Sequence, residues 1–131
     1  MEISISEEQD HVIRVATNSA IKPLLESGNV FPTVFVHDSD QVRYFTFELG
    51  ALDKLRPLVR STLAEKCPNA LAYAFAYDSS IEQDGKEVDA LIIESADAED
   101  EESLEFAVIY DRTEKSHCEK QFIGRTDSLL Q

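Results

Sequence analysis

The sequence predicts a single α+β domain, in which a mainly antiparallel sheet packs with two helices on one of its faces. Three observations favour this class. The chain has 131 residues, of which 43% are hydrophobic and 29% charged, as is typical of one globular domain. Two segments carry apolar residues at helical spacing, whereas residues 70–112 have the composition of strands. The expected order is α-β-β-α-β-β-β, followed by one further short strand at 121–124.

The first helix is predicted over residues 7–26. Ser6 and Gln9 have the spacing of a capping box, in which Ser6 caps the first turn and Gln9 reaches back to it. Apolar residues then recur at helical spacing. Pro23 is expected to kink or tighten the last turn, and Gly28 provides a stop signal.

A hairpin and a second helix are predicted next. Residues 30–37 and 42–48 are rich in β-branched and aromatic side chains and flank a short polar turn. Pro32 indicates that the first of these strands lies at a sheet edge or begins irregularly. Leucines at helical spacing predict a helix over 51–66, in which Pro57 marks a kink or a late start and Pro68 forces the exit.

Residues 70–112 predict three long strands. Segments 70–82 and 87–96 flank Asp84-Gly85, a dipeptide typical of a two-residue hairpin turn. If these two residues form the turn, Phe75 opposes Glu94 and Tyr77 opposes Ile92. An acidic loop at 97–102 then leads to a strand at 104–112. The residues after Arg125 are expected to be partly disordered.

Both faces of this hairpin are apolar, because one carries aromatic side chains and the other is rich in alanine. Strands of this kind are covered on both sides. In one alternative, the helices pack on the alanine face, and long side chains, a bent sheet or a second subunit cover the aromatic face. This alternative predicts a homodimer, since large exposed apolar patches commonly mark interfaces. In the other, the helices lie on the aromatic face and the alanine face is open.

Glu94 is the strongest candidate for a functional residue, as an acid, a base or an anchor for a ligand. The hairpin register places it beside three aromatic residues, where desolvation would raise the pKa of its carboxyl group. The candidate binding residues are Glu94, Tyr73, Tyr77, Asp78 and Tyr110. In the alternative interpretation Glu94 is structural, either bonded to a tyrosine hydroxyl or solvated at a strand end. A one-residue bulge would move it to the opposite face.

Other kinds of site lack their sequence signals. His11, His37 and His117 show no metal-binding spacing, and the acidic loop lacks the glycine of an EF-hand. Four glycines without a known motif exclude a phosphate-binding loop. No catalytic residue, metal or cofactor is therefore predicted, and a non-enzyme is favoured. Cys67 and Cys118 have no CxxC spacing, and two reduced thiols are favoured over a stray disulfide. Together with an acidic N-terminus and the absence of a long apolar run, they predict a cytoplasmic, bacterial protein.

The net charge of −14 is the unusual bulk property, and residues 70–102 hold eleven acidic residues and one basic residue. Direct binding to nucleic acid or to an anionic membrane needs positive charge and is disfavoured. A basic protein partner is compatible with this charge. Lys54, Arg56 and Arg60 give the second helix a basic side, which we expect to be solvated.

The strands of residues 70–112 resemble small uncharacterised bacterial proteins built around the same hairpin. The resemblance rests on Ala-Phe-Ala-Tyr-Asp at 74–78, Asp84-Gly85, Asp-Ala-Leu-Ile-Ile-Glu at 89–94, and residues 107–110. It covers about a third of the chain. It implies an α+β domain of unknown function and assigns no site residues.

Two functional hypotheses follow. The first is a non-catalytic acidic interaction protein that self-associates or binds a basic protein partner through residues 78–102, with a toxin-neutralising or nucleic-acid-mimicking inhibitor as its specific version. The second is an enzyme or small-ligand-binding protein that uses the carboxylate and tyrosine cluster around Glu94.

Overall fold

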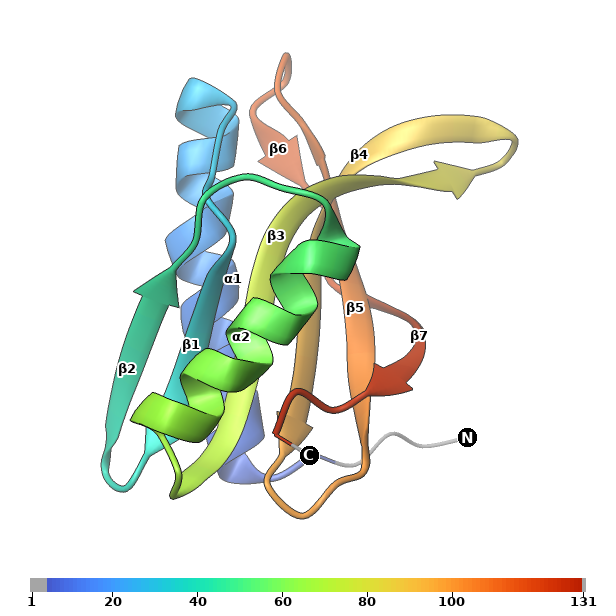
Figure 1. Ribbon diagram of the computed structural model, residues 1–131. Coiled ribbons are helices and arrows are strands. Elements are labelled where there is room, and N and C mark those ends of the chain that lie inside the picture. Colours follow the sequence, from blue (N-terminus) through green and yellow to red (C-terminus); the bar gives the residue numbers. More distant parts are fainter. Residues whose placement is uncertain (1–4, 131) are drawn as a thin grey trace.

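A seven-stranded antiparallel sheet forms the centre of the molecule, and one helix covers each of its faces (Figure 1). The computed structural model describes residues 5–130. The predicted α+β class and the order of the main elements are confirmed, and β6 is an additional two-residue strand. The elements are α1 (Glu7–Ser27), β1 (Thr33–Asp38), β2 (Gln41–Thr46), α2 (Leu52–Lys66), β3 (Ala70–Gln83), β4 (Lys86–Asp97), β5 (Glu102–Asp111), β6 (Ser116–His117) and β7 (Gln121–Asp127).

The sheet has the strand order β2-β1-β3-β4-β5, and β6 and β7 both pair with β5, near its two ends. Pro32 precedes β1, which lies between β2 and β3 and is therefore not an edge strand. The predicted hairpin register is confirmed from Gln83↔Lys86 to Ala72↔Asp97. Its turn residues Asp84 and Gly85 have φ values of 51° and 78°, as the predicted two-residue turn requires.

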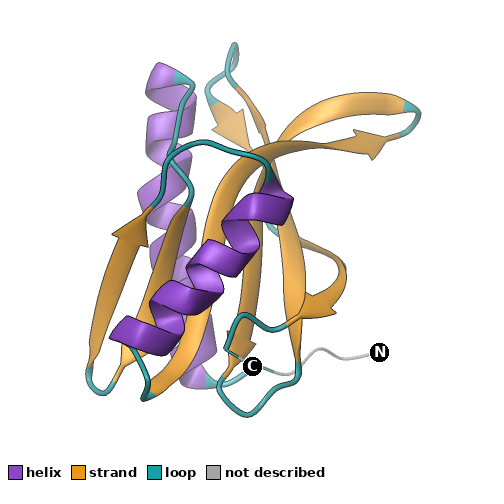
Figure 2. Cartoon of the chain, viewed as in Figure 1, coloured by secondary structure: helices purple, strands orange, loops and turns teal. Residues whose placement is uncertain are grey.

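The prediction that both helices pack on one face is wrong, because α1 and α2 lie on opposite faces of the sheet (Figure 2). The alanines of β3 at 72, 74 and 76 pack in the cluster under α1. Tyr73 and Phe75 alternate with them and pack in the cluster under α2. Since β3 and β4 are central strands that are apolar on both sides, each face needs its own helix. The uncovered face that predicted a homodimer is therefore absent at Tyr73 and Phe75.

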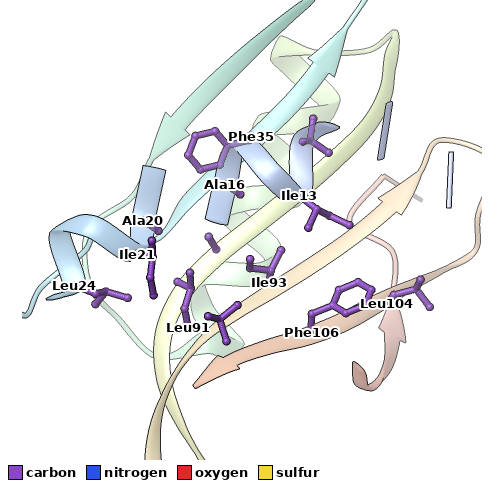
Figure 3. Close-up of a cluster of buried hydrophobic side chains, with 14 of the residues drawn as sticks. Ile13, Ala16, Ala20, Ile21, Leu24, Phe35, Leu91, Ile93, Leu104 and Phe106 are labelled. Atoms are coloured by element: carbon purple, nitrogen blue, oxygen red, sulfur yellow. The ribbon is translucent and has the colours of Figure 1, made fainter. Parts of the chain in front are cut away.

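The core under α1 is built from one stripe of the helix and the even-numbered face of β3 (Figure 3). Ala16 and Ala20 let the helix approach closely, and Ile13, Ile21 and Leu24 fill the space above Leu91 and Ile93. Ser6 caps α1 by accepting a hydrogen bond from the Gln9 amide at 3.0 Å. Gly28 ends the helix in the left-handed conformation, with φ 81°.

The predicted second helix at 51–66 is confirmed, because α2 spans Leu52–Lys66, with Pro57 inside it and no side-chain cap at its start. The residues after Arg125 were predicted to be partly disordered, and in the structure Ser128 and Leu129 of this segment are fully buried. Leu129 packs in the core under α2, which keeps this segment in place.

The hairpin of β3 and β4 projects beyond the rest of the sheet (Figure 1). Strand β1 pairs with β3 only as far as Ala76, and β5 pairs with β4 only from Ala90 onward. Residues 77–89 therefore extend past both neighbouring strands. The acidic loop at 97–102 lies at the opposite end of β4. No helix in the described part of the chain is long and apolar enough to cross a membrane.

Candidate functional site

The five predicted site residues form two clusters on opposite faces of the sheet. Glu94, Tyr73 and Tyr77 lie on the α2 face, because directly paired residues of neighbouring strands share a face. Asp78 follows Tyr77 and so points to the α1 face, where its carboxylate meets Tyr110. The structure therefore does not bring the five residues into one site.

Glu94 is a buried carboxylate whose two oxygens are both engaged. Its side chain is 2% exposed. One oxygen accepts a hydrogen bond from the hydroxyl of Tyr73, and the other pairs with the guanidinium of Arg56. Arg56 was predicted to be solvated, but its side chain is only 20% exposed and lies against the sheet. A buried charge is stable only when it is paired and hydrogen-bonded, and this carboxylate meets both conditions.

Tyr73 connects this ion pair to the end of the described chain. Its ring is completely buried, and burial raises the pKa of its hydroxyl. The hydroxyl donates to Glu94 and accepts a hydrogen bond from the backbone N–H of Leu129, with an N–O distance of 3.1 Å. Tyr73 therefore remains a neutral donor at physiological pH and supports both the carboxylate and the segment that covers it.

Two arginines of α2 bind the same final segment by its main chain. Arg56 donates to the carbonyl oxygen of Asp127 at 2.6 Å, and Arg60 donates to that of Ser128 at 3.2 Å. The Nε atom of Arg60 is buried without a hydrogen-bond partner. Sequence reasoning missed these roles because the contacts join residues about seventy positions apart, and no local pattern signals them.

Tyr77 lies at the edge of the α2 face. Burial, followed by the nearby carboxylate of Glu105, raises the pKa of its hydroxyl to about 12. Its side chain lines a cavity of about 250 Å³ beside the first turns of α2, together with Leu52 and Leu55. Asp78 and Ser79, the residues that follow Tyr77 along β3, also line this cavity.

The second cluster consists of Asp78, Tyr110 and Arg112 on the α1 face. The Tyr110 hydroxyl donates to Asp78 at 2.6 Å, and Arg112 lies 3.2 Å from the same carboxylate and 2.9 Å from the hydroxyl. Burial and the bond to Asp78 raise the pKa of Tyr110. Arg112 also donates to the carbonyl of Gly28 at 2.8 Å, which ties the end of α1 to the sheet. Strand alternation from Tyr110 was the signal that could have identified Arg112.

The cysteines and histidines lie apart from both clusters. Cys67 is buried, and burial raises the pKa of its thiol. Cys118 is exposed and lines a cleft of about 430 Å³ with His117, Lys120 and the apolar side chains of Ile13 and Val108. Within residues 5–130, no group of three potential metal-binding side chains lies together.

Comparisons with known proteins assign no function to this chain. Neither family models, nor curated proteins, nor solved structures give a match to the chain. The two polar clusters hold elements together: one joins α2 and the final segment to the sheet, and the other joins β3, β5 and the end of α1. Neither cluster presents a nucleophile beside a base in an open cleft, which is the arrangement that covalent catalysis uses.

Proposed function

We propose that this chain is a non-catalytic interaction protein that binds a basic protein partner through the projecting hairpin of β3 and β4. The observation that carries the proposal is the distribution of charge on this hairpin. Residues 78–89 hold five acidic side chains and one lysine. Because directly paired residues share a face, Glu82, Glu87 and Asp89 lie on the same side of the hairpin, opposite Tyr77 and Ile81.

The paired glutamates support an electrostatic role for this face. Glu82 lies directly opposite Glu87, and like charges in such a pair are destabilising. Glu87 accepts a hydrogen bond from the hydroxyl of Ser80 at 2.6 Å. A cationic partner would relieve this repulsion on binding, and dense carboxylates on a projecting element increase the rate of encounter with such a partner.

The engagement of Glu94 also favours binding over catalysis. Its two oxygens are occupied by Tyr73 and Arg56, and the final segment covers the cluster. A substrate would have to displace a buried ion pair to reach this carboxylate, which is costly. The predicted interaction surface of residues 78–102 also divides into two parts, since the hairpin tip and the loop at 97–102 lie at opposite ends of β4.

The test compares two triple variants with the same change in charge. Glu82→Gln, Glu87→Gln and Asp89→Asn neutralise the hairpin, and Glu99→Gln, Glu101→Gln and Glu102→Gln neutralise the loop. Each variant and the wild-type chain are used as bait in host lysate at low salt, and bound proteins are eluted with a salt gradient. We expect a basic protein that the wild type and the loop variant capture and the hairpin variant does not. Equal capture by both variants, or capture unaffected by salt, would contradict the proposal.

A second candidate function is binding of a small ligand, and the cavity beside Tyr77 and Asp78 favours it. The volume of about 250 Å³ is just below that of common ligand sites, and most of the lining is apolar, with Leu49, Leu52 and Leu55 beside the ring of Tyr77. Fragment screening by two-dimensional NMR would test this function. We expect shifts at Tyr77 and Ser79 that Leu52→Trp, which fills the cavity, abolishes. Unchanged spectra with every fragment would exclude it.

A further inference from the structure

The final described segment, residues 127–130, is held between α2 and the sheet in the way that a binding protein holds a peptide. Three side chains bond to main-chain atoms of three successive residues. Arg56 binds the Asp127 carbonyl, Arg60 binds the Ser128 carbonyl, and Tyr73 accepts from the Leu129 N–H. A fourth bond runs from the Ser128 N–H to the carbonyl oxygen of Glu101 at 3.0 Å. These four hydrogen bonds involve main-chain atoms of the segment and so do not depend on its sequence. Specificity for a sequence must come from contacts with its side chains.

Leu129 supplies the apolar anchor of this segment. Its side chain is 1% exposed and packs in the core under α2. A cavity of about 260 Å³ continues past it, lined by Leu63, Cys67 and Leu130 among others. Main-chain hydrogen bonds that give affinity, combined with a pocket for a side chain, are the common design of peptide-recognition sites. We call this site, formed by Arg56, Arg60, Leu63 and Tyr73, the α2 slot.

We propose that the α2 slot is a peptide-binding site that exchanges its segment with the same segment of a second copy of the chain. The bonds join the slot to main-chain atoms, so they form equally well with a segment that another copy supplies. The chain's own sequence is the one that fits the slot. Residues 121–131 contain one arginine and one aspartate, so the side chains of this segment carry no net charge. The segment is therefore not repelled by a second copy of the chain, whose net charge is −14. The proposal is independent of the function assigned to the hairpin.

The connection to this segment is compatible with exchange. Residues 118–120, between β6 and β7, are all exposed. Strand β7 pairs with β5 alone, so an exchanged copy has one strand pairing and one slot to restore.

The first test measures binding of a fluorescein-labelled peptide with the sequence of residues 121–131 to the full-length chain by anisotropy. We expect Leu129→Ala protein to bind the peptide at least tenfold more tightly than the wild type, because its own segment competes less well for the slot. Leu58→Ala removes an exposed leucine from the same helix and should leave binding as in the wild type. A peptide with aspartate at the position of Leu129 should bind neither protein. Folded Leu129→Ala protein that binds neither peptide, or both equally, would overturn the proposal.

The second test measures exchange directly. Deletion of Glu119 and Lys120 shortens the connection, so that β7 and the segment no longer reach their own sheet and slot. We expect this variant to form a dimer with native circular dichroism, detected by size-exclusion chromatography with light scattering. Insertion of four glycine and serine residues at the same place should leave the chain monomeric. A monomeric deletion variant whose residues after 120 are rapidly cleaved by protease would show that the segment does not exchange.

Discussion

At the scale of single residues, the buried ion pair of Arg56 and Glu94 fixes what the α2 face can do. The carboxylate is almost completely removed from water, and its partners are a tyrosine and an arginine from two different elements. Charges buried in this way add little net stability over apolar residues, but removal of one partner leaves the other uncompensated. The pair therefore positions α2 over the sheet more than it strengthens the fold.

The first prediction concerns this pair. Arg56→Ala should lower the free energy of unfolding by about 2–3 kcal/mol, because Glu94 is then left buried with only Tyr73 as a partner. Adding Glu94→Gln to this variant should recover part of the loss, since a neutral amide tolerates burial better. Urea unfolding of the single and double variants measures both effects. Lys54→Ala, on the exposed side of the same helix, is the control and should change the stability by less than about 0.5 kcal/mol. A double variant less stable than Arg56→Ala would contradict this interpretation.

A second residue-scale prediction concerns the pH dependence of Asp97. Burial, together with the negative charges of Asp100, Glu8 and Glu99, raises the pKa of this carboxyl, which accepts a hydrogen bond from Ser6 at 2.5 Å. A carboxyl whose pKa is higher in the folded state than in the unfolded state lowers the free energy of unfolding at pH values above its folded pKa. This loss of stability disappears as the pH falls through the folded pKa to the pKa of the unfolded chain, about 3.9. Asp97→Asn, which keeps an acceptor for Ser6, should therefore raise the melting temperature by a few degrees at pH 7.

The measurement is thermal unfolding of both proteins between pH 7 and pH 4. The difference in melting temperature should shrink steadily as the pH falls. Asp40→Asn, an exposed turn residue with the same change in charge, should show a smaller difference at pH 7. An Asp97→Asn protein that is less stable than the wild type at pH 7 would show that the hydrogen bond with Ser6 outweighs the burial of the charge.

At the scale of elements, the β3–β4 hairpin was the part that the sequence specified most completely. Asp84-Gly85 defines a two-residue turn, and the turn length fixes the register of every pair from Gln83 to Asp97. The register in turn predicted correctly that Glu94 lies near Tyr73. The partner Arg56 was not predicted, because the position of α2 depends on packing between elements that no local pattern encodes.

The third prediction tests the opposed glutamates of this hairpin. Glu82→Lys places a cation directly opposite Glu87 and should raise the free energy of unfolding by about 0.5–1 kcal/mol. Glu114→Lys makes the same change in charge at an exposed turn, so it reports the general relief of negative charge. Urea unfolding of the two variants, with the wild type as reference, isolates the cross-strand contribution. Equal effects of the two substitutions would indicate that the pairing of Glu82 with Glu87 costs nothing.

At the scale of the whole molecule, the sheet faces on which the two helices pack could not be predicted from the sequence. The alternation of alanine with Tyr73 and Phe75 showed correctly that both faces of β3 need cover. It could not assign a helix to each face, because α1 and α2 each carry an apolar stripe that fits either side. The burial of Leu129 was missed for a related reason, since a short polar segment with two leucines has no periodicity to interpret.

The fourth prediction concerns the net charge of −14, which acts on the molecule as a whole. Self-repulsion of this size destabilises the compact state, and salt screens it, with a Debye length that falls from about 30 Å at 0.01 M to about 8 Å at 0.15 M. Salt also weakens attractive pairs, but Arg56–Glu94 is mostly buried and is screened much less. Sodium chloride should therefore raise the melting temperature by several degrees over this range.

The loop variant Glu99→Gln, Glu101→Gln and Glu102→Gln tests whether repulsion causes this dependence. Glu99 lies close enough to Asp97 to raise its pKa, and so does Glu8 in the first turn of α1, so this end of the sheet is crowded with negative charge. Removing three charges from this crowded region should raise the melting temperature at low salt and reduce its slope against salt concentration. A melting temperature that falls as salt is added would mean that attractive surface pairs outweigh repulsion. In that case the excess of acidic residues would impose no cost on the fold for a basic partner to relieve.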